Sequence, residues 1–176
     1  MQGSFSIRLA RTGEFLLGAL FLCAAVLKLA NVPLFASQIL SYEVITNPKL
    51  VALAAEFLVP LEAALGLAML AGIRLRGTVF YAAIAMLLFF SVLVAYAWPQ
   101  NCGCFGPIKL GPVETLAKNA IMFLIAAFGA TVLKNQGDTE PQFHPVGKWL
   151  TVVLLTALAG YFAHDELYNS AKYFSK

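Results

Sequence analysis

Charged residues are scarce in this sequence. Asp, Glu, Lys and Arg make up only 12% of its 176 residues, whereas 60% are hydrophobic and the mean hydropathy is +0.79. Soluble domains carry about 25% charged residues, so this chain has too little charge to cover a surface that faces water. A lipid bilayer is its natural solvent, and we predict an integral membrane protein.

Other shortages exclude further classes of protein. The net charge of +3 is small and dispersed, and no basic run with interleaved aromatic residues occurs, so nucleic-acid binding has no support. Three cysteines are too few for a disulfide-stapled scaffold.

Long apolar segments are what the sequence has in place of charge. A spanning helix needs about 20 mostly apolar residues, and only helices satisfy an isolated backbone in lipid. We predict an all-α membrane protein with five spans, at residues 13–32, 49–72, 77–98, 113–134 and 146–164. Arg8 and Arg11 before the first apolar run also fit a signal peptide, but Lys28 interrupts that run and no clear cleavage site follows, so we interpret the segment as a retained helix.

The distribution of positive charge predicts how these helices are oriented. With a cytoplasmic N-terminus, the inner side holds Arg8, Arg11, Arg74, Arg76, Lys134 and Lys148, and the outer side holds Lys49, Lys109, Lys172 and Lys176. In a bacterium, this places a multi-pass protein in the inner membrane, with the loop around residues 102–104 and the C-terminus in the periplasm.

The connecting segments differ in character. Residues 31–48 place Leu34, Phe35, Ile39 and Tyr42 at roughly helical spacing, which predicts a short amphipathic helix at the membrane surface. The polar stretch 134–143 is predicted as a cytoplasmic loop, and residues 164–176 as an outer amphipathic tail.

Two cysteines lie either side of one glycine in the sequence "NCGCFGP", which begins at residue 101. A disulfide needs a Cα separation of about 4.4–6.8 Å, and Gly103 permits a bent backbone that supplies it. So short a loop gives little entropic stabilisation, and strained, exposed bridges tend to be labile or catalytic. We therefore interpret Cys102 and Cys104 as a redox couple.

Two other interpretations of this pair stay open. The cysteines could be unreactive residues of an interface, or they could ligate zinc or copper together with His164, which the predicted topology places on the same side. Cys23, in the first span, is interpreted as a small packing residue.

Polar residues inside the predicted spans are costly and tend to mark function or an internal partner. From the helix rise, Lys28 lies about 6 Å and Glu56 about 10 Å below the outer ends of their helices, so we predict that they could pair. Glu62 lies about 20 Å deep by the same rise and has no obvious partner. These groups could also be contacts between helices or side chains that reach toward the interface.

Lys118 and Asn119 follow the cysteine loop closely. Glu114 and Lys118 have the spacing and order of a favourable helical ion pair. A cation near Cys102 or Cys104 would favour the thiolate, the form that attacks disulfides.

The sequence resembles the MauE proteins of the wider DoxX-like membrane group. The most specific element is "NCGCFGP", and the resemblance also rests on the segments "LGALFLCAAVLKLANVPLFASQILSYEVI", "LVPLEAALGLAML" and "LAKNAIMFLIAA", in this order over about 130 positions. Lys118 stands where the resemblance leads us to expect arginine. The resemblance implies a four-helix membrane domain over residues 1–140, with residues 141–176 forming an additional helix and tail.

The resemblance also implies a function at the membrane. MauE itself is associated with maturation of methylamine dehydrogenase, and related proteins accompany thioredoxin-like periplasmic partners or take part in quinone-linked sulfur oxidation. We therefore expect thiol–disulfide exchange at Cys102 and Cys104 with a periplasmic thioredoxin-like or disulfide-containing protein. Lys118, Asn119, Glu62 and Lys28 are the expected supporting residues, and a quinone is a candidate cofactor. The alternative is a non-catalytic accessory subunit of a larger membrane complex.

Overall fold

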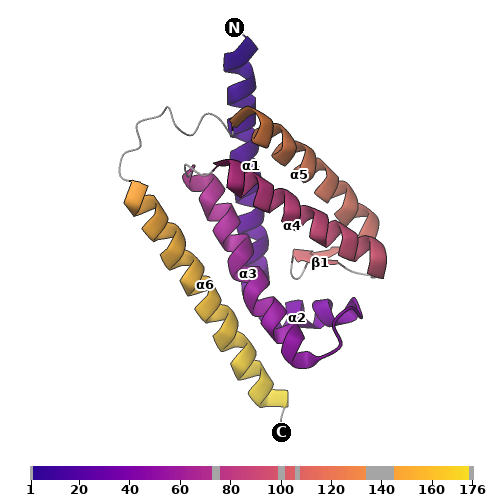
Figure 1. Ribbon diagram of the computed structural model, residues 1–176. Helices are drawn as coiled ribbons and strands as arrows, with labels where there is room; N and C mark the ends of the chain where they lie inside the picture. The colour runs from indigo at the N-terminus through magenta and orange to yellow at the C-terminus, as the bar shows by residue number, and fades with distance from the viewer. Residues whose placement is uncertain (1, 73–75, 99–101, 106–107, 134–144, 175–176) are drawn as a thin grey trace.

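A computed structural model describes residues 2–72, 76–98, 102–105, 108–133 and 145–174 (Figure 1). The helices are α1 (Gln2–Leu29), α2 (Val32–Ser41), α3 (Pro48–Ala71), α4 (Arg76–Ala97), α5 (Pro112–Leu133) and α6 (Pro145–Phe174). Two short strands, β1 (Cys102–Phe105) and β2 (Ile108–Leu110), lie between α4 and α5. The predicted all-α membrane fold is confirmed, with this small hairpin added to it.

Five of these helices are long and apolar enough to cross a membrane. The candidate spans are Ser4–Leu29, Pro48–Ala71, Gly77–Ala97, Pro112–Leu133 and Trp149–Tyr168. The protein is therefore a multi-pass membrane protein, as predicted.

The ends of the first and last helices differ from the prediction. Helix α1 begins about three turns earlier than expected. The expectation that the last helix ends near His164 is wrong, because α6 continues to Phe174. No glycine or proline occurs between these two residues, so nothing in the sequence stops the helix there.

Local sequence signals explain several helix boundaries. The side chain of Asn31 accepts a hydrogen bond from the Leu34 backbone nitrogen at the start of α2, and Asn47 accepts one from Lys49 at the start of α3. Helix α3 ends at Gly72, whose φ of 60° lies in the left-handed region that glycine adopts at no steric cost.

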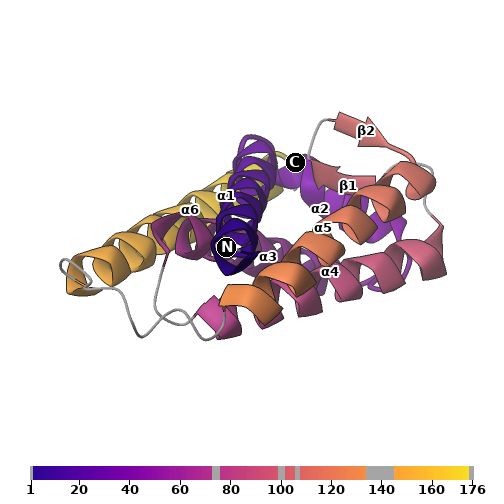
Figure 2. The ribbon, with the colours of Figure 1, turned by 90° about the horizontal axis from the view of Figure 1, so that it is seen from above.

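Helix α1 is the centre of the bundle. Seen along its axis, it has α6 on one side and α4 and α5 on the other (Figure 2). It crosses α3 closely: a Cβ added at Gly66 would lie 2.7 Å from the Leu22 backbone nitrogen and 2.9 Å from the Gly18 carbonyl oxygen. Small residues at such a crossing let membrane helices approach until their backbones touch.

Helices α3 and α4 diverge from the connection that joins them, and α2 lies between their far ends (Figure 1). Helix α2 buries Val32 and Phe35 against Ala55 and Val59 of α3. The predicted short helix is therefore present. Of the residues predicted to form its apolar face, Phe35 is buried and Leu34 is exposed.

The hairpin lies at the same end of the bundle as α2. Strand β1 contacts α1, α2 and α5, and pairs with β2 in antiparallel fashion. Cys102 pairs with Leu110 and Phe105 with Ile108, so the register shifts by one residue between the two pairs. The polar segment predicted as a loop at 134–143 lies outside the described residues.

Candidate functional site

A buried ion pair joins α1 to α3. The Lys28 ammonium donates to Oε1 of Glu62, and the two residues are only 1% and 4% exposed. The Lys28 Nζ also lies 5.0 Å from the ring centroid of Phe35 and 5.5 Å from that of Phe90. These distances fall within the range of cation–π contacts, so the ammonium is held by one carboxylate and two aromatic faces.

The predicted pairing of Lys28 with Glu56 is wrong. The Glu56 carboxylate instead lies 3.0 Å from Nδ1 of His164 on α6. The prediction assumed that α1 and α3 end at the same depth. The Gly18–Gly66 crossing sets a different register, in which α3 extends beyond the end of α1. Lys28 therefore meets Glu62, which lies six residues, or about 9 Å, further along α3 than Glu56.

Lys118 and Asn119 of α5 approach the Glu62 carboxylate. Together with Glu62 and apolar residues of α1 and α4, they line a cavity of about 30 Å³, large enough for a water molecule. The Asn119 amide donates to Oγ of Ser91 at 3.1 Å. Within the described part of the chain, the buried Oε2 of Glu62 accepts no hydrogen bond.

The supporting residues expected from the sequence thus gather in one place. Lys28, Glu62, Lys118 and Asn119 come from three helices and meet in the interior of the bundle. Sequence reasoning missed Ser91, although a hydroxyl inside an otherwise apolar span is itself a signal.

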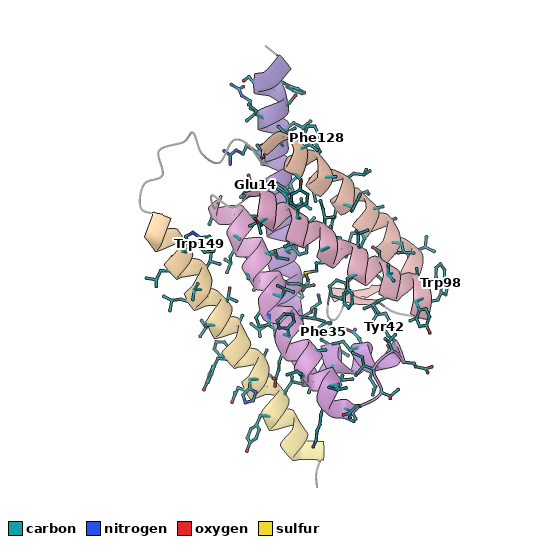
Figure 3. All side chains as sticks on the ribbon, viewed as in Figure 1. Glu14, Phe35, Tyr42, Trp98, Phe128 and Trp149 are labelled. Carbon is teal, nitrogen blue, oxygen red and sulfur yellow. The ribbon has the colours of Figure 1, made fainter. Side chains whose placement is uncertain are left out.

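A second, larger cavity lies on the other side of Phe90. Its volume is about 660 Å³. Its walls come from three helices, α2, α3 and α4, and from the residues just after α2. Phe35 and Tyr42 lie in the angle between α3 and α4 (Figure 3). Lys28 belongs to this cavity and Glu62 to the smaller one, while Phe90 borders both.

The two cysteines of the motif occupy β1, beside the ends of α1, α2 and α5. Their side chains lie outside the described residues. The influence of Lys118 on a thiolate and metal ligation by Cys102 and Cys104 therefore stay predictions. The Glu114–Lys118 pair also stays a prediction.

Cys23 differs from its expected role. It was expected to pack inside the bundle, but its side chain is exposed on the outer surface of α1. In a membrane helix an exposed position is still apolar, so a small hydrophobic residue indicates nothing about which face it occupies.

Five apolar helices and a buried ion pair define a multi-pass membrane protein with a small polar cluster in an apolar interior. The family model for methylamine utilisation protein MauE matches residues 7–132. The chain therefore belongs to the MauE family, as the resemblance indicated. Comparisons with curated proteins and with solved structures found no significant match. The family match covers α1 to most of α5 and leaves α6 outside it.

Proposed function

We propose that this protein exchanges thiols and disulfides with a periplasmic protein through Cys102 and Cys104. The observation that carries the proposal is the position of both cysteines in one short strand at the end of the bundle, beside helices α1 and α5. These helices also carry Lys28 and Lys118 of the buried polar cluster. Membership of the MauE family adds support for a role in the membrane.

A bond between the two cysteines requires β1 to bend between them. Residues two apart in an extended strand are separated by roughly 6.6 Å, close to the upper limit of about 6.8 Å for a disulfide. The register shift between Cys102 and Phe105 indicates a bulge, and a bulge bends the strand that carries it. A bridge across one intervening residue closes too small a loop to stabilise the fold much, which favours a reactive bond over a structural one.

The exchange conserves atoms and electrons. A thiolate of the partner attacks one sulfur of the Cys102–Cys104 disulfide, forms a mixed disulfide and releases the other cysteine as a thiolate. The partner's second thiol then attacks the mixed disulfide, so that the partner is oxidised and the cysteine pair is reduced. The same steps in reverse transfer a disulfide from the partner to this protein.

Trapping the mixed disulfide tests the proposal. Cys104→Ser and Cys102→Ser each leave one reactive thiol without its resolving partner, so at least one of them should attack the disulfide of an oxidised periplasmic protein and hold it as a complex that dithiothreitol releases. Cys23→Ser in the wild-type background is the matched control and should leave the redox behaviour of the pair unchanged.

Two results would contradict the proposal. One is the absence of any mixed disulfide with both single variants. The other is full activity of the double variant Cys102→Ala/Cys104→Ala in complementation of a deletion strain, which would favour the accessory-subunit role.

A further inference from the structure

The large cavity between α3 and α4 is continuous with the outer surface of the bundle. Phe57 of α3 and Phe89 of α4 line the cavity and are also 65% and 53% exposed. Both helices are candidate membrane spans, so this surface meets the hydrocarbon chains of the bilayer. The molecules that adjoin the opening of the cavity are therefore lipids.

The walls of the cavity are almost entirely apolar. Among the described residues, only Lys28 and Tyr42 contribute polar side chains to them. Engineered apolar cavities of about 150 Å³ stay dry and take up apolar ligands, and this cavity, of about 660 Å³, is larger. An unfilled cavity would forfeit the van der Waals contacts of its lining. Hydrocarbon is the filling that such walls favour.

The cavity is elongated. Its lining follows one face of each helix, over residues 54–65 of α3 and residues 82–93 of α4. Eleven helical steps correspond to a length of about 16 Å. The hydrocarbon core of a bilayer is about 30 Å thick, so this length is close to the depth that the chains of one leaflet cover. The shape suits an extended chain.

The charges beside the cavity do not select a head group. Lys28 donates to Glu62, and its ammonium also lies 5.0 Å from the ring centroid of Phe35. Lys118 approaches the same carboxylate, but both Lys118 and Glu62 line the smaller cavity and not the large one. A lipid whose chain enters the large cavity from the side leaves its head group at the membrane surface, away from these buried residues.

We propose that the cavity is a binding site for one acyl chain of a bilayer phospholipid, which enters between α3 and α4. The chain also contacts α2, because Phe35 and Ile39 of that helix line the cavity. Helix α2 in turn contacts the cysteine strand β1. The bound lipid therefore supports the helix beside the cysteine pair, whether or not the pair exchanges disulfides.

Photo-crosslinking tests the occupant. The full chain is reconstituted in phosphatidylcholine vesicles that contain a small share of a phospholipid with a diazirine on one acyl chain. After irradiation, adducts should form on Leu65 and Met86, which line the cavity and are only 7% and 6% exposed. Lipids around the outside of the bundle should label Leu154 of α6, which is 59% exposed, and this labelling is the internal standard.

Variants that fill the cavity supply the comparison. Ala85→Trp should reduce the adducts on Leu65 by about tenfold, as expected for a loss of about 1.4 kcal/mol in affinity. Ala54→Trp fills the cavity from the opposite wall and should have the same effect, so the test does not depend on the folding of one variant. Ala95→Trp is the matched control, because Ala95 is exposed on α4 and does not line the cavity. It should be labelled as the wild type is.

Two changes of lipid composition separate the possible occupants. Replacement of part of the phosphatidylcholine by phosphatidylglycerol with the same chains should leave the ratio of Leu65 to Leu154 adducts unchanged, because the head group stays outside. A small share of oleate should also leave it unchanged. A marked fall with oleate would overturn the proposal and indicate that Lys28 and Lys118 recruit a free carboxylate. The absence of adducts on Leu65 and Met86 in the wild type, or equal labelling of Ala85→Trp and Ala95→Trp, would also overturn it.

Hydrogen exchange tests the contact with α2. In detergent, added phosphatidylcholine should slow the exchange of the α2 amides in the wild type and in Ala95→Trp, because a ligand that binds the folded state suppresses its opening. The same addition should have little effect on Ala85→Trp. Equal protection in the two variants would show that lipid acts elsewhere on the bundle and would contradict the proposal.

Discussion

The Lys28–Glu62 pair gives a quantitative test of the interior of the bundle. Both partners are almost fully buried. The change Lys28→Met keeps the length of the side chain and removes the cation that donates a hydrogen bond to the Glu62 carboxylate. Breaking a buried ion pair from one side costs about 3–5 kcal/mol. For a chain of this size, about 2–4 °C in melting temperature corresponds to 1 kcal/mol, which gives a loss of about 6–20 °C.

The second partner completes a double-mutant cycle. Glu62→Leu alone leaves Lys28 buried and should be similarly destabilising. The combined variant Lys28→Met/Glu62→Leu removes both charges of the pair, so it should recover most of the loss. The comparison needs the melting temperatures of the three variants in one detergent. Each is measured from the loss of the monodisperse gel-filtration peak on heating.

A matched control is available on helix α3, about two turns before Glu62. Glu56 pairs with His164 at a site where the side chains are 30% and 66% exposed, and exposed pairs contribute less than about 1 kcal/mol. Glu56→Gln should therefore barely change the melting temperature. If Lys28→Met is equally harmless, or if the losses of the two single variants simply add in the double variant, the buried pair is not the interaction described here.

Three further predictions follow from other parts of the molecule. Gly66→Val places carbon atoms against the backbone of α1 and should cost about 1–3 kcal/mol, whereas Gly147→Ala, which meets nothing within 4 Å, should leave the melting temperature unchanged or raise it slightly. Reporter fusions should show the N-terminus in the cytoplasm and the C-terminus in the periplasm; the reverse pattern would contradict the predicted orientation and leave the cysteine strand in a reducing compartment. Cys23, on the outer surface of a spanning helix, should react with a membrane-permeant maleimide and resist a charged one, and labelling by the charged reagent in intact membranes would show that this surface faces water.

The sequence predicted the helices better than their contacts. Apolar length alone locates five spans, because lipid permits few other backbone structures. The short helix after the first span was also recognisable from Phe35 and Ile39. The end of α6 was not recognisable from the sequence. The residues beyond His164 are polar enough to leave the membrane, but they continue the helix.

The residues of the candidate site could be predicted from the sequence, but the contacts between them could not. Lys28, Glu62, Lys118 and Asn119 stand out as polar residues in apolar segments, and the structure brings them together. The partner of Lys28 depended on the register between α1 and α3, which the glycines at the crossing set. Depth counted from the ends of apolar segments carries no information about that register, and it favoured Glu56. The large cavity depends on the divergence of α3 and α4, which local sequence does not encode.

The close crossing of α1 and α3 limits how this family can vary in length. One residue inserted between Gly18 and Lys28 would turn the lysine by about 100° around the axis of its helix and direct its charge toward a neighbour that cannot accept it. An insertion in the stretch between α2 and α3 would leave this register unchanged and would lengthen a connection that borders the large cavity, at a cost of a few tenths of a kcal/mol in closure entropy. Gains and losses of residues among relatives should therefore accumulate in that connection and be rare in the last three turns of α1.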